Sequence, residues 1–254
     1  NWFPDGKINL YENFILKNLK KFPKKIAIIA LDKDKNIKKN NFQQINNLIL
    51  EFERKFFFDL KKKQRVVVHA SSSIESAISM LACIKNGFHF CVIFEELENI
   101  SIKKRIKIFK PNLILTYYPN RFKSKKKIRI ENFNKFNFRA KTVRYKNSNI
   151  LYFDSNKSLF TLFTSGTTGE PKGVVHSTGG YALYTLTTCK KQFGIKKDSI
   201  ILTASDAGWI NGHTYSLIGP LLLGATTVLI YKPTFLLDLK ILKKVLNLKI
   251  TILY

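Results

Sequence analysis

The chain is poor in cysteine, in acidic residues and in uninterrupted apolar segments. Its 254 residues include three cysteines, Cys83, Cys91 and Cys189, and no C-x-x-C pair. An odd number at this spacing excludes a disulfide framework and the common zinc-site patterns. Because apolar residues flank Cys83 and Cys91, we expect both in a core. The cysteine usage suits a reducing compartment, and we expect a cytoplasmic protein.

Segment 207–231 has no charged residue, yet it lacks the composition of a membrane span. It is interrupted by Asn211, His213, Pro220, Gly212, Gly219 and Gly224. We predict a buried loop, helix and strand there instead of a membrane segment. The first residues, Asn1–Asp5, also lack the basic and apolar regions of a signal peptide. We therefore expect no membrane partner.

Acidic residues are scarce: 17 Asp and Glu stand against 44 Lys and Arg, for a net charge of +27. Such a charge is compatible with a nucleic-acid partner. However, the basic residues are spread over many short segments, and only 121–146 concentrates them, with eleven Lys or Arg and one Glu. No nucleic-acid motif accompanies them. We interpret the lysines as residues at tolerant surface positions and expect no specific nucleic-acid partner.

Hydrophobic periodicity alternates between helix and strand along most of the chain. This alternation predicts an α/β fold, with layered mixed or parallel sheets and flanking helices. Helices are predicted at 10–22, 41–60, 74–86, 100–109, 180–192, 212–223 and 236–247. Strands are predicted at 25–31, 65–70, 88–94, 112–117, 159–163, near 173–176, and at 199–203, 225–231 and 249–254.

The most informative motif is residues 164–173, Thr-Ser-Gly-Thr-Thr-Gly-Glu-Pro-Lys-Gly, which follows a predicted strand. Glycines let backbone N–H groups turn toward one point and form an anion-binding nest. Ser165, Thr167 and Thr168 add hydroxyl donors, and Lys172 adds a positive charge. The common P-loop is excluded, because Pro171 and Gly173 occupy its second glycine and its Ser/Thr position. The alternative is a polar hairpin turn that binds nothing.

The run 162–181 resembles the signature loop of the adenylate-forming acyl-CoA synthetases. His176–Tyr181, the loop Ala204–Tyr215 and the opening Trp2–Leu10 are most similar to the acetyl-CoA and propionyl-CoA synthetase branch. The resemblance implies part of the large N-terminal domain of such an enzyme. We expect a first α/β subdomain at about 1–120, a variable basic segment at 121–157, and the start of a second α/β subdomain at 158–254.

The resemblance also implies roles for single residues. It implies that Lys172 stabilises phosphate charge. It also implies that the enzyme uses ATP and Mg²⁺, with coenzyme A as co-substrate. The acyl pocket would contain Trp209, Ile210, Asn211 and His213, although core packing is an alternative for Trp209 and His213. ATP phosphate contacts are expected from Thr164, Ser165, Gly166, Thr167, Thr168, Gly169 and Lys172.

Two departures from the family pattern stand out. Asn211 replaces a β-branched or small hydroxyl residue of the acetyl branch, which leaves acyl specificity open. Residues Phe94–Glu98 carry three carboxylates where the family has glycines near the CoA phosphates, and the basic run 121–129 is a candidate for compensation. The family's acidic Mg²⁺ motif, ribose aspartate and C-terminal domain with its lysine lie outside this chain. We therefore expect no metal ligand here and no complete adenylation by these residues alone.

The sequence thus predicts part of an enzyme that activates a short carboxylate with ATP and passes it to CoA, with acetate as first choice. Propionyl- and acetoacetyl-CoA synthetase are the alternatives within the family. A basic, non-catalytic α/β remnant that binds nucleotides or anions is the alternative from another class. The sequence leaves the oligomeric state open.

Overall fold

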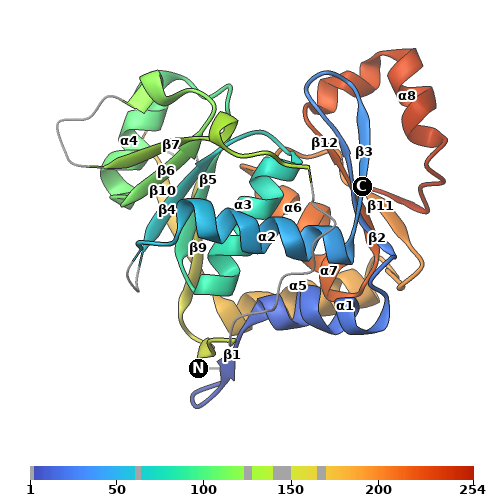
Figure 1. Ribbon diagram of the computed structural model, residues 1–254, viewed down its shortest axis with the longest axis horizontal. Helices are drawn as coiled ribbons and strands as arrows, with labels where there is room; N and C mark the ends of the chain where they lie inside the picture. The colour runs from blue at the N-terminus through green and yellow to red at the C-terminus, as the bar shows by residue number, and fades with distance from the viewer. Residues whose placement is uncertain (1–2, 61–63, 123–127, 140–149, 165–169) are drawn as a thin grey trace.

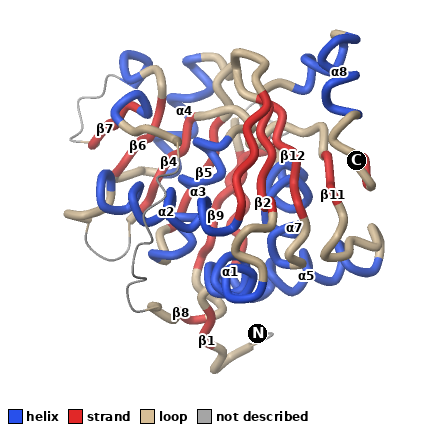
Figure 2. The backbone as a smooth tube through the Cα atoms, turned by 45° about the vertical axis from the view of Figure 1, so that its right-hand side comes forward, coloured by secondary structure: helices blue, strands red, loops and turns tan. Residues whose placement is uncertain are grey.

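The alternation of helices and strands folds into layers in the computed structural model, which describes residues 3–60, 64–122, 128–139, 150–164 and 170–254. The α/β fold predicted from the sequence is confirmed. Helices α2, α3, α6 and α7 lie between two sheets, α4 covers the outer face of one sheet, and α8 covers the outer face of the other (Figure 1). Helices α1 and α5 lie together at one end of the sheets in both views (Figures 1 and 2).

The described helices keep close to the predicted positions. They are α1 (Lys17–Lys21), α2 (Phe42–Phe56), α3 (Ile74–Asn86), α4 (Asn99–Phe109), α5 (Thr178–Lys191), α6 (Ile210–His213), α7 (Gly219–Leu222) and α8 (Leu239–Leu246).

The larger sheet has six strands in the order β10-β9-β5-β4-β6-β7, and the second has five in the order β13-β11-β12-β2-β3. Neighbours are parallel except in the hairpins β9–β10 and β2–β3. β1 and β8 form a separate antiparallel pair. The strands are β1 (Lys7–Ile8), β2 (Ile26–Leu31), β3 (Ile37–Asn41), β4 (Arg65–His69), β5 (His89–Ile93), β6 (Leu113–Thr116), β7 (Arg129–Asn132), β8 (Phe153–Asp154), β9 (Ser158–Thr164), β10 (Lys172–Ser177), β11 (Ile200–Leu202), β12 (Thr226–Ile230) and β13 (Ile252–Leu253).

Each large sheet takes strands from both sides of segment 121–157. β2 pairs with β12 near the end of the chain and with β3 at the sheet edge, while β9 and β10 join β4–β7. The segments 1–120 and 158–254 therefore each contribute strands to both large sheets.

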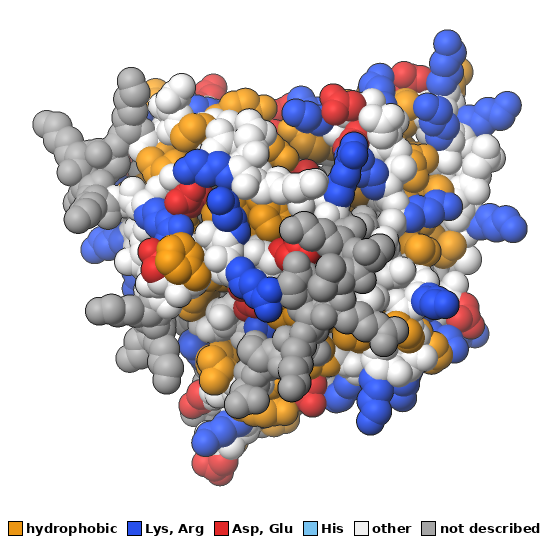
Figure 3. Space-filling model, viewed as in Figure 1, with side chains coloured by type: hydrophobic (Ala, Val, Ile, Leu, Met, Phe, Trp, Pro, Cys, Tyr) orange, Lys and Arg blue, Asp and Glu red, His pale blue; other side chains and the backbone are white. Residues whose placement is uncertain are grey.

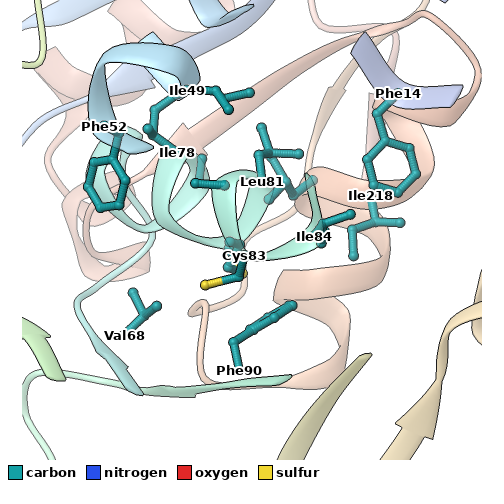
Figure 4. Close-up of a cluster of buried hydrophobic side chains, with 14 of the residues drawn as sticks. Phe14, Ile49, Phe52, Val68, Ile78, Leu81, Cys83, Ile84, Phe90 and Ile218 are labelled. Atoms are coloured by element: carbon teal, nitrogen blue, oxygen red, sulfur yellow. The ribbon is translucent and has the colours of Figure 1, made fainter. Parts of the chain in front are cut away.

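Helix α3 is the centre of the main core. Ser73 and Ser76 form a capping box at its start, so its first N–H groups are satisfied, and Gly87 ends it in a left-handed conformation with φ of 62°. Between these caps the helix is buried on almost every side, as Figure 4 shows for Ile78, Leu81, Cys83 and Ile84 among side chains of α2 and β5. Cys83 and Cys91 lie in the core as predicted.

The predicted helix at 212–223 is interrupted by a π-helical turn. α6 runs into that turn at Thr214–Ile218, and α7 begins at Gly219. Pro220 has no N–H to donate to the carbonyl of Ser216, and the hydroxyl of Thr227 donates to that carbonyl instead, at 2.5 Å. The proline thus explains why the regular helix ladder stops here.

The sequence did not predict β1, β3, β7 or β8. β3 reads Ile-Lys-Lys-Asn-Asn and has no apolar alternation, because it is an edge strand with one paired neighbour, β2. Within the described residues no helix is both long and apolar enough to span a membrane. The uncharged segment 207–231 forms helical turns and β12, as predicted. Basic side chains are spread over the face shown in Figure 3.

We predict that Leu81→Ala lowers the free energy of unfolding by about 2–5 kcal/mol, because it opens a cavity beneath a fully buried side chain. Urea denaturation measures the change. Leu183→Ala is the control, since Leu183 lies on α5 and is 38% exposed. An equal loss in both variants would contradict the central position of α3.

Candidate functional site

The predicted phosphate loop is carried by the β9–β10 hairpin. Thr164 and Lys172 face each other across the two strands at the loop end of the hairpin, and both are exposed. Ser165, Gly166, Thr167, Thr168 and Gly169 lie outside the described residues. The hairpin therefore fixes both ends of the loop. The phosphate contacts assigned to the loop stay a prediction.

The predicted acyl loop follows β11 and is shaped by Asp206. The Asp206 carboxylate accepts the N–H of Gly208 at 2.8 Å, and its carbonyl accepts the N–H of Trp209 at 3.1 Å. A side chain at Gly212 would place its Cβ 2.1 Å from that carbonyl, so only glycine fits the turn. Burial raises the pKa of Asp206 to about 6, against the opposing effect of the Gly208 N–H.

The loop places its predicted pocket residues differently. Trp209 is 64% exposed, which excludes core packing for its ring, whereas Ile210 and Asn211 are half-buried. His213 is fully buried, with its ring centroid 4.7 Å from that of Phe160 in β9 and 5.9 Å from that of Phe90 in β5. Its contact with a substrate stays a prediction.

Burial lowers the pKa of His213 to about 3, although the nearby Ala207 backbone opposes the shift. Among the described residues neither ring nitrogen makes a hydrogen bond of ordinary geometry. The ring is therefore held neutral, as part of the aromatic cluster under the loop.

The strands that precede the two candidate loops belong to different sheets. β9 belongs to the six-stranded sheet and β11 to the five-stranded sheet. The loop after β11 is joined to the hairpin through α6, whose His213 packs against Phe160 of β9. Packing of the helical layer, and not strand pairing, makes this connection.

A cavity of about 370 Å³ joins the hairpin to the start of α6. It lies where β10 passes into α5, and His176 at its edge stacks on Phe160 with ring centroids 4.6 Å apart. The cavity is lined by Val175, His176, Ser177, Gly180, Tyr181, Tyr184 and Ile210. Ile210 is thus the predicted acyl-pocket residue that lines a cavity shared with the phosphate hairpin.

The acidic segment after β5 does not present all of its carboxylates to solvent. Glu95 is buried and accepts a hydrogen bond from the hydroxyl of Tyr231, and Glu96 pairs with Lys232. Both partners follow β12, so the two bonds join the ends of the two large sheets. Burial raises the pKa of Glu95, and the Tyr231 hydrogen bond opposes that rise.

Arg121 supports the same segment from the basic run 121–129. Its guanidinium donates to the carbonyls of Glu95 and Leu97 at 2.5 and 2.6 Å. The sequence had suggested that this run offsets the carboxylates, and Arg121 instead contacts their backbone. Sequence reasoning missed Tyr231 and Lys232, because no local pattern links residues some 136 positions apart.

In the part of the chain that the structure describes, no group of three His, Cys, Asp or Glu side chains is arranged to hold a metal ion. We therefore assign no Mg²⁺ ligand to these residues.

Comparison with known proteins decides the family. The family model described as "AMP-binding enzyme" matches residues 16–254. The chain belongs to this family. It is 30% identical to the acetyl-coenzyme A synthetase of Helicobacter pylori (strain G27) over 90% of its own length, and 28% identical to that of Ralstonia pickettii (strain 12J) over 89%. It spans 40% and 39% of those relatives, respectively.

The fold agrees with this assignment. The crystal structure of a Brucella canis acyl-CoA synthetase superposes with a TM-score of 0.77 at 17% identity, over 98% of this chain and 47% of that one. The chain is therefore similar to less than half of each of these proteins.

We predict that His213 makes the protein less stable in acid. The folded state keeps the ring neutral down to about pH 3, whereas the unfolded ring takes up a proton near pH 6.5, so stability is complete above pH 6.5 and falls below it. At pH 5 this loss amounts to about 2 kcal/mol. The His213→Phe variant lacks it, and denaturant unfolding at pH 7 and pH 5 measures the difference.

His69 and His89, whose pKa values burial lowers to about 4, remain in both proteins and cancel in that comparison. An equal pH dependence of stability in the two proteins would contradict the buried neutral state of His213.

Proposed function

We propose that this chain forms part of an ATP-dependent acyl-CoA synthetase that activates a short-chain carboxylate, with acetate as the first choice. The observation that carries the proposal is the β9–β10 hairpin, which carries the family's loop sequence. Phe160 of this hairpin contacts His213, which follows the candidate acyl residues in α6. Propionate and acetoacetate are the alternatives as acids.

In this proposal the carboxylate attacks the α-phosphorus of ATP, the acyl-adenylate forms, and pyrophosphate leaves. CoA thiol then displaces AMP to give the acyl-CoA. The protein's task in the first step is to position two anions and stabilise the developing phosphate charge. Thr164, the loop at 165–169 and Lys172 are proposed to bind the phosphates, with Lys172 at the start of β10, where the chain leaves the loop. Mg²⁺ would offset further phosphate charge when bound.

Ile210 and Asn211 are proposed to contact the acyl group, with Trp209 beside them. Their support is their place at the start of α6, next to the cavity that β10 and α5 line. The buried His213 would hold this segment against β9 and β5, so that the acyl and phosphate sites keep a fixed distance. CoA binding is proposed for the whole enzyme, and the paired Glu95 and Glu96 reduce the charge that would repel it.

We predict that Lys172→Ala lowers kcat/KM for ATP about a hundredfold, because one preorganised positive charge on the phosphates is lost. Acid-dependent exchange of pyrophosphate into ATP, catalysed by the complete gene product, measures it. Lys191→Ala is the matched control, since Lys191 is also exposed but lies at the end of α5. Equal activity of the two variants would remove Lys172 from the site.

We also predict that the same exchange is fastest with acetate among acetate, propionate and acetoacetate. One methylene in an apolar pocket changes kcat/KM by about 10–200-fold, so the panel separates the acids. Asn211→Thr should alter the acetate-to-propionate ratio. ATP binding without acid-dependent exchange would favour the non-catalytic nucleotide-binding alternative.

A further inference from the structure

The outward face of α8 combines exposed leucines with lysines. Leu237 and Leu239 are 82% and 78% exposed, the highest values among the large hydrophobic side chains of the described residues, and Leu246 is 58% exposed. Single exposed leucines are ordinary on protein surfaces. Three of them within ten residues, Leu237 in the 3-10 turn Pro233–Leu237 and the others in α8, form an exposed apolar patch.

Helical spacing places Leu239, Lys243 and Leu246 along one stripe, because residues three and four apart lie on the same face. The opposite face holds the element to the five-stranded sheet through Ile241 and Val245, which are buried with residues of β2, β11 and β12. The leucine stripe is therefore the side that no described residue covers.

Positive charge surrounds the leucines. Residues 232–254 include five lysines and one acidic residue, Asp238. That aspartate caps α8 through the N–H groups of Lys240 and Ile241, and Lys35 of the β2–β3 turn pairs with it at 3.2 Å. No carboxylate of this segment is thus left unpaired beside the leucines, and the patch attracts anions.

We propose that this face of α8 binds the surface of a bilayer that contains anionic lipids. A helix with leucines on its outer face and lysines beside them lies in the interface with its apolar side chains among the acyl chains, while the lysines reach the headgroups. Among the described residues α8 lies at the outer margin, where basic side chains project with hydrophobic surface between them (Figures 1 and 3).

The charge disfavours a second copy of this chain as the occupant, since two such faces would repel each other. The proposal differs from the sequence-based expectation of no membrane partner. That expectation concerned spanning segments, and a helix that lies on a bilayer needs neither their length nor their composition.

Co-sedimentation of the full chain with vesicles tests the proposal. We expect binding to phosphatidylcholine vesicles with about 30% phosphatidylserine, weak binding without phosphatidylserine, and loss of binding in high salt. Leu237→Ser/Leu239→Ser/Leu246→Ser should weaken binding at least about tenfold. Leu183→Ser/Leu186→Ser, which alters the exposed leucines of α5, should leave it unchanged.

The contribution of the lysines is tested with a second variant and its matched control. Lys243→Glu/Lys244→Glu should weaken binding about thirtyfold, at about 1 kcal/mol for each lysine. Lys190→Glu/Lys191→Glu makes the same change in the last turn of α5 and should have little effect. Circular dichroism confirms that each variant is folded.

Three results would overturn the proposal. The first is no binding of the wild-type chain to either vesicle. The second is equal weakening by the α8 and α5 variants, which would assign the binding to the overall charge of +27. The third is self-association of the wild-type chain that the triple leucine variant abolishes, which would make a second copy the occupant.

Discussion

The structure depends on one shared layer of buried helices between two sheets. α3 supplies side chains that are enclosed on nearly all sides, and the main core continues from it into α2, β2, β5, β9 and α7. Burial of this apolar surface is the dominant favourable contribution to folding. Because both large sheets pack on the same helices, the position of each sheet is fixed relative to the other. Any site made from both sheets inherits its geometry from this core.

The candidate site follows directly from that arrangement. The phosphate hairpin ends the larger sheet, and the acyl loop follows a strand of the second sheet. His213 on α6 and Phe160 on β9 join them within the core, and Glu95 with Tyr231 joins the sheets at their ends. A neutral buried histidine and a carboxylate with a raised pKa both cost solvation energy. His213 packs against Phe160 and Glu95 is bonded to Tyr231, and these contacts hold the two sheets together next to the loops.

Charge is used differently in different parts of the molecule. Near the candidate site, Arg121 donates to a backbone carbonyl of the segment after β5, and Lys232 forms an ion pair with Glu96 there. These two positive charges therefore stabilise the fold. Around α8 the lysines stand beside exposed leucines and meet solvent. The net charge alone does not distinguish these roles. Only the partner of each lysine shows whether it supports the fold or marks a surface.

The sequence by itself determined the α/β class, most helices and strands, and the family resemblance, because periodicity, capping residues and the run 164–173 are local patterns. It located β9, β10 and β11 correctly. It missed β3, whose polar sequence carries no alternation. Tertiary structure alone decided sheet membership, the burial of His213, and the pairing of Glu95 with Tyr231. Those features depend on contacts between residues far apart in the chain, which arise only when the helical layer is packed between the sheets.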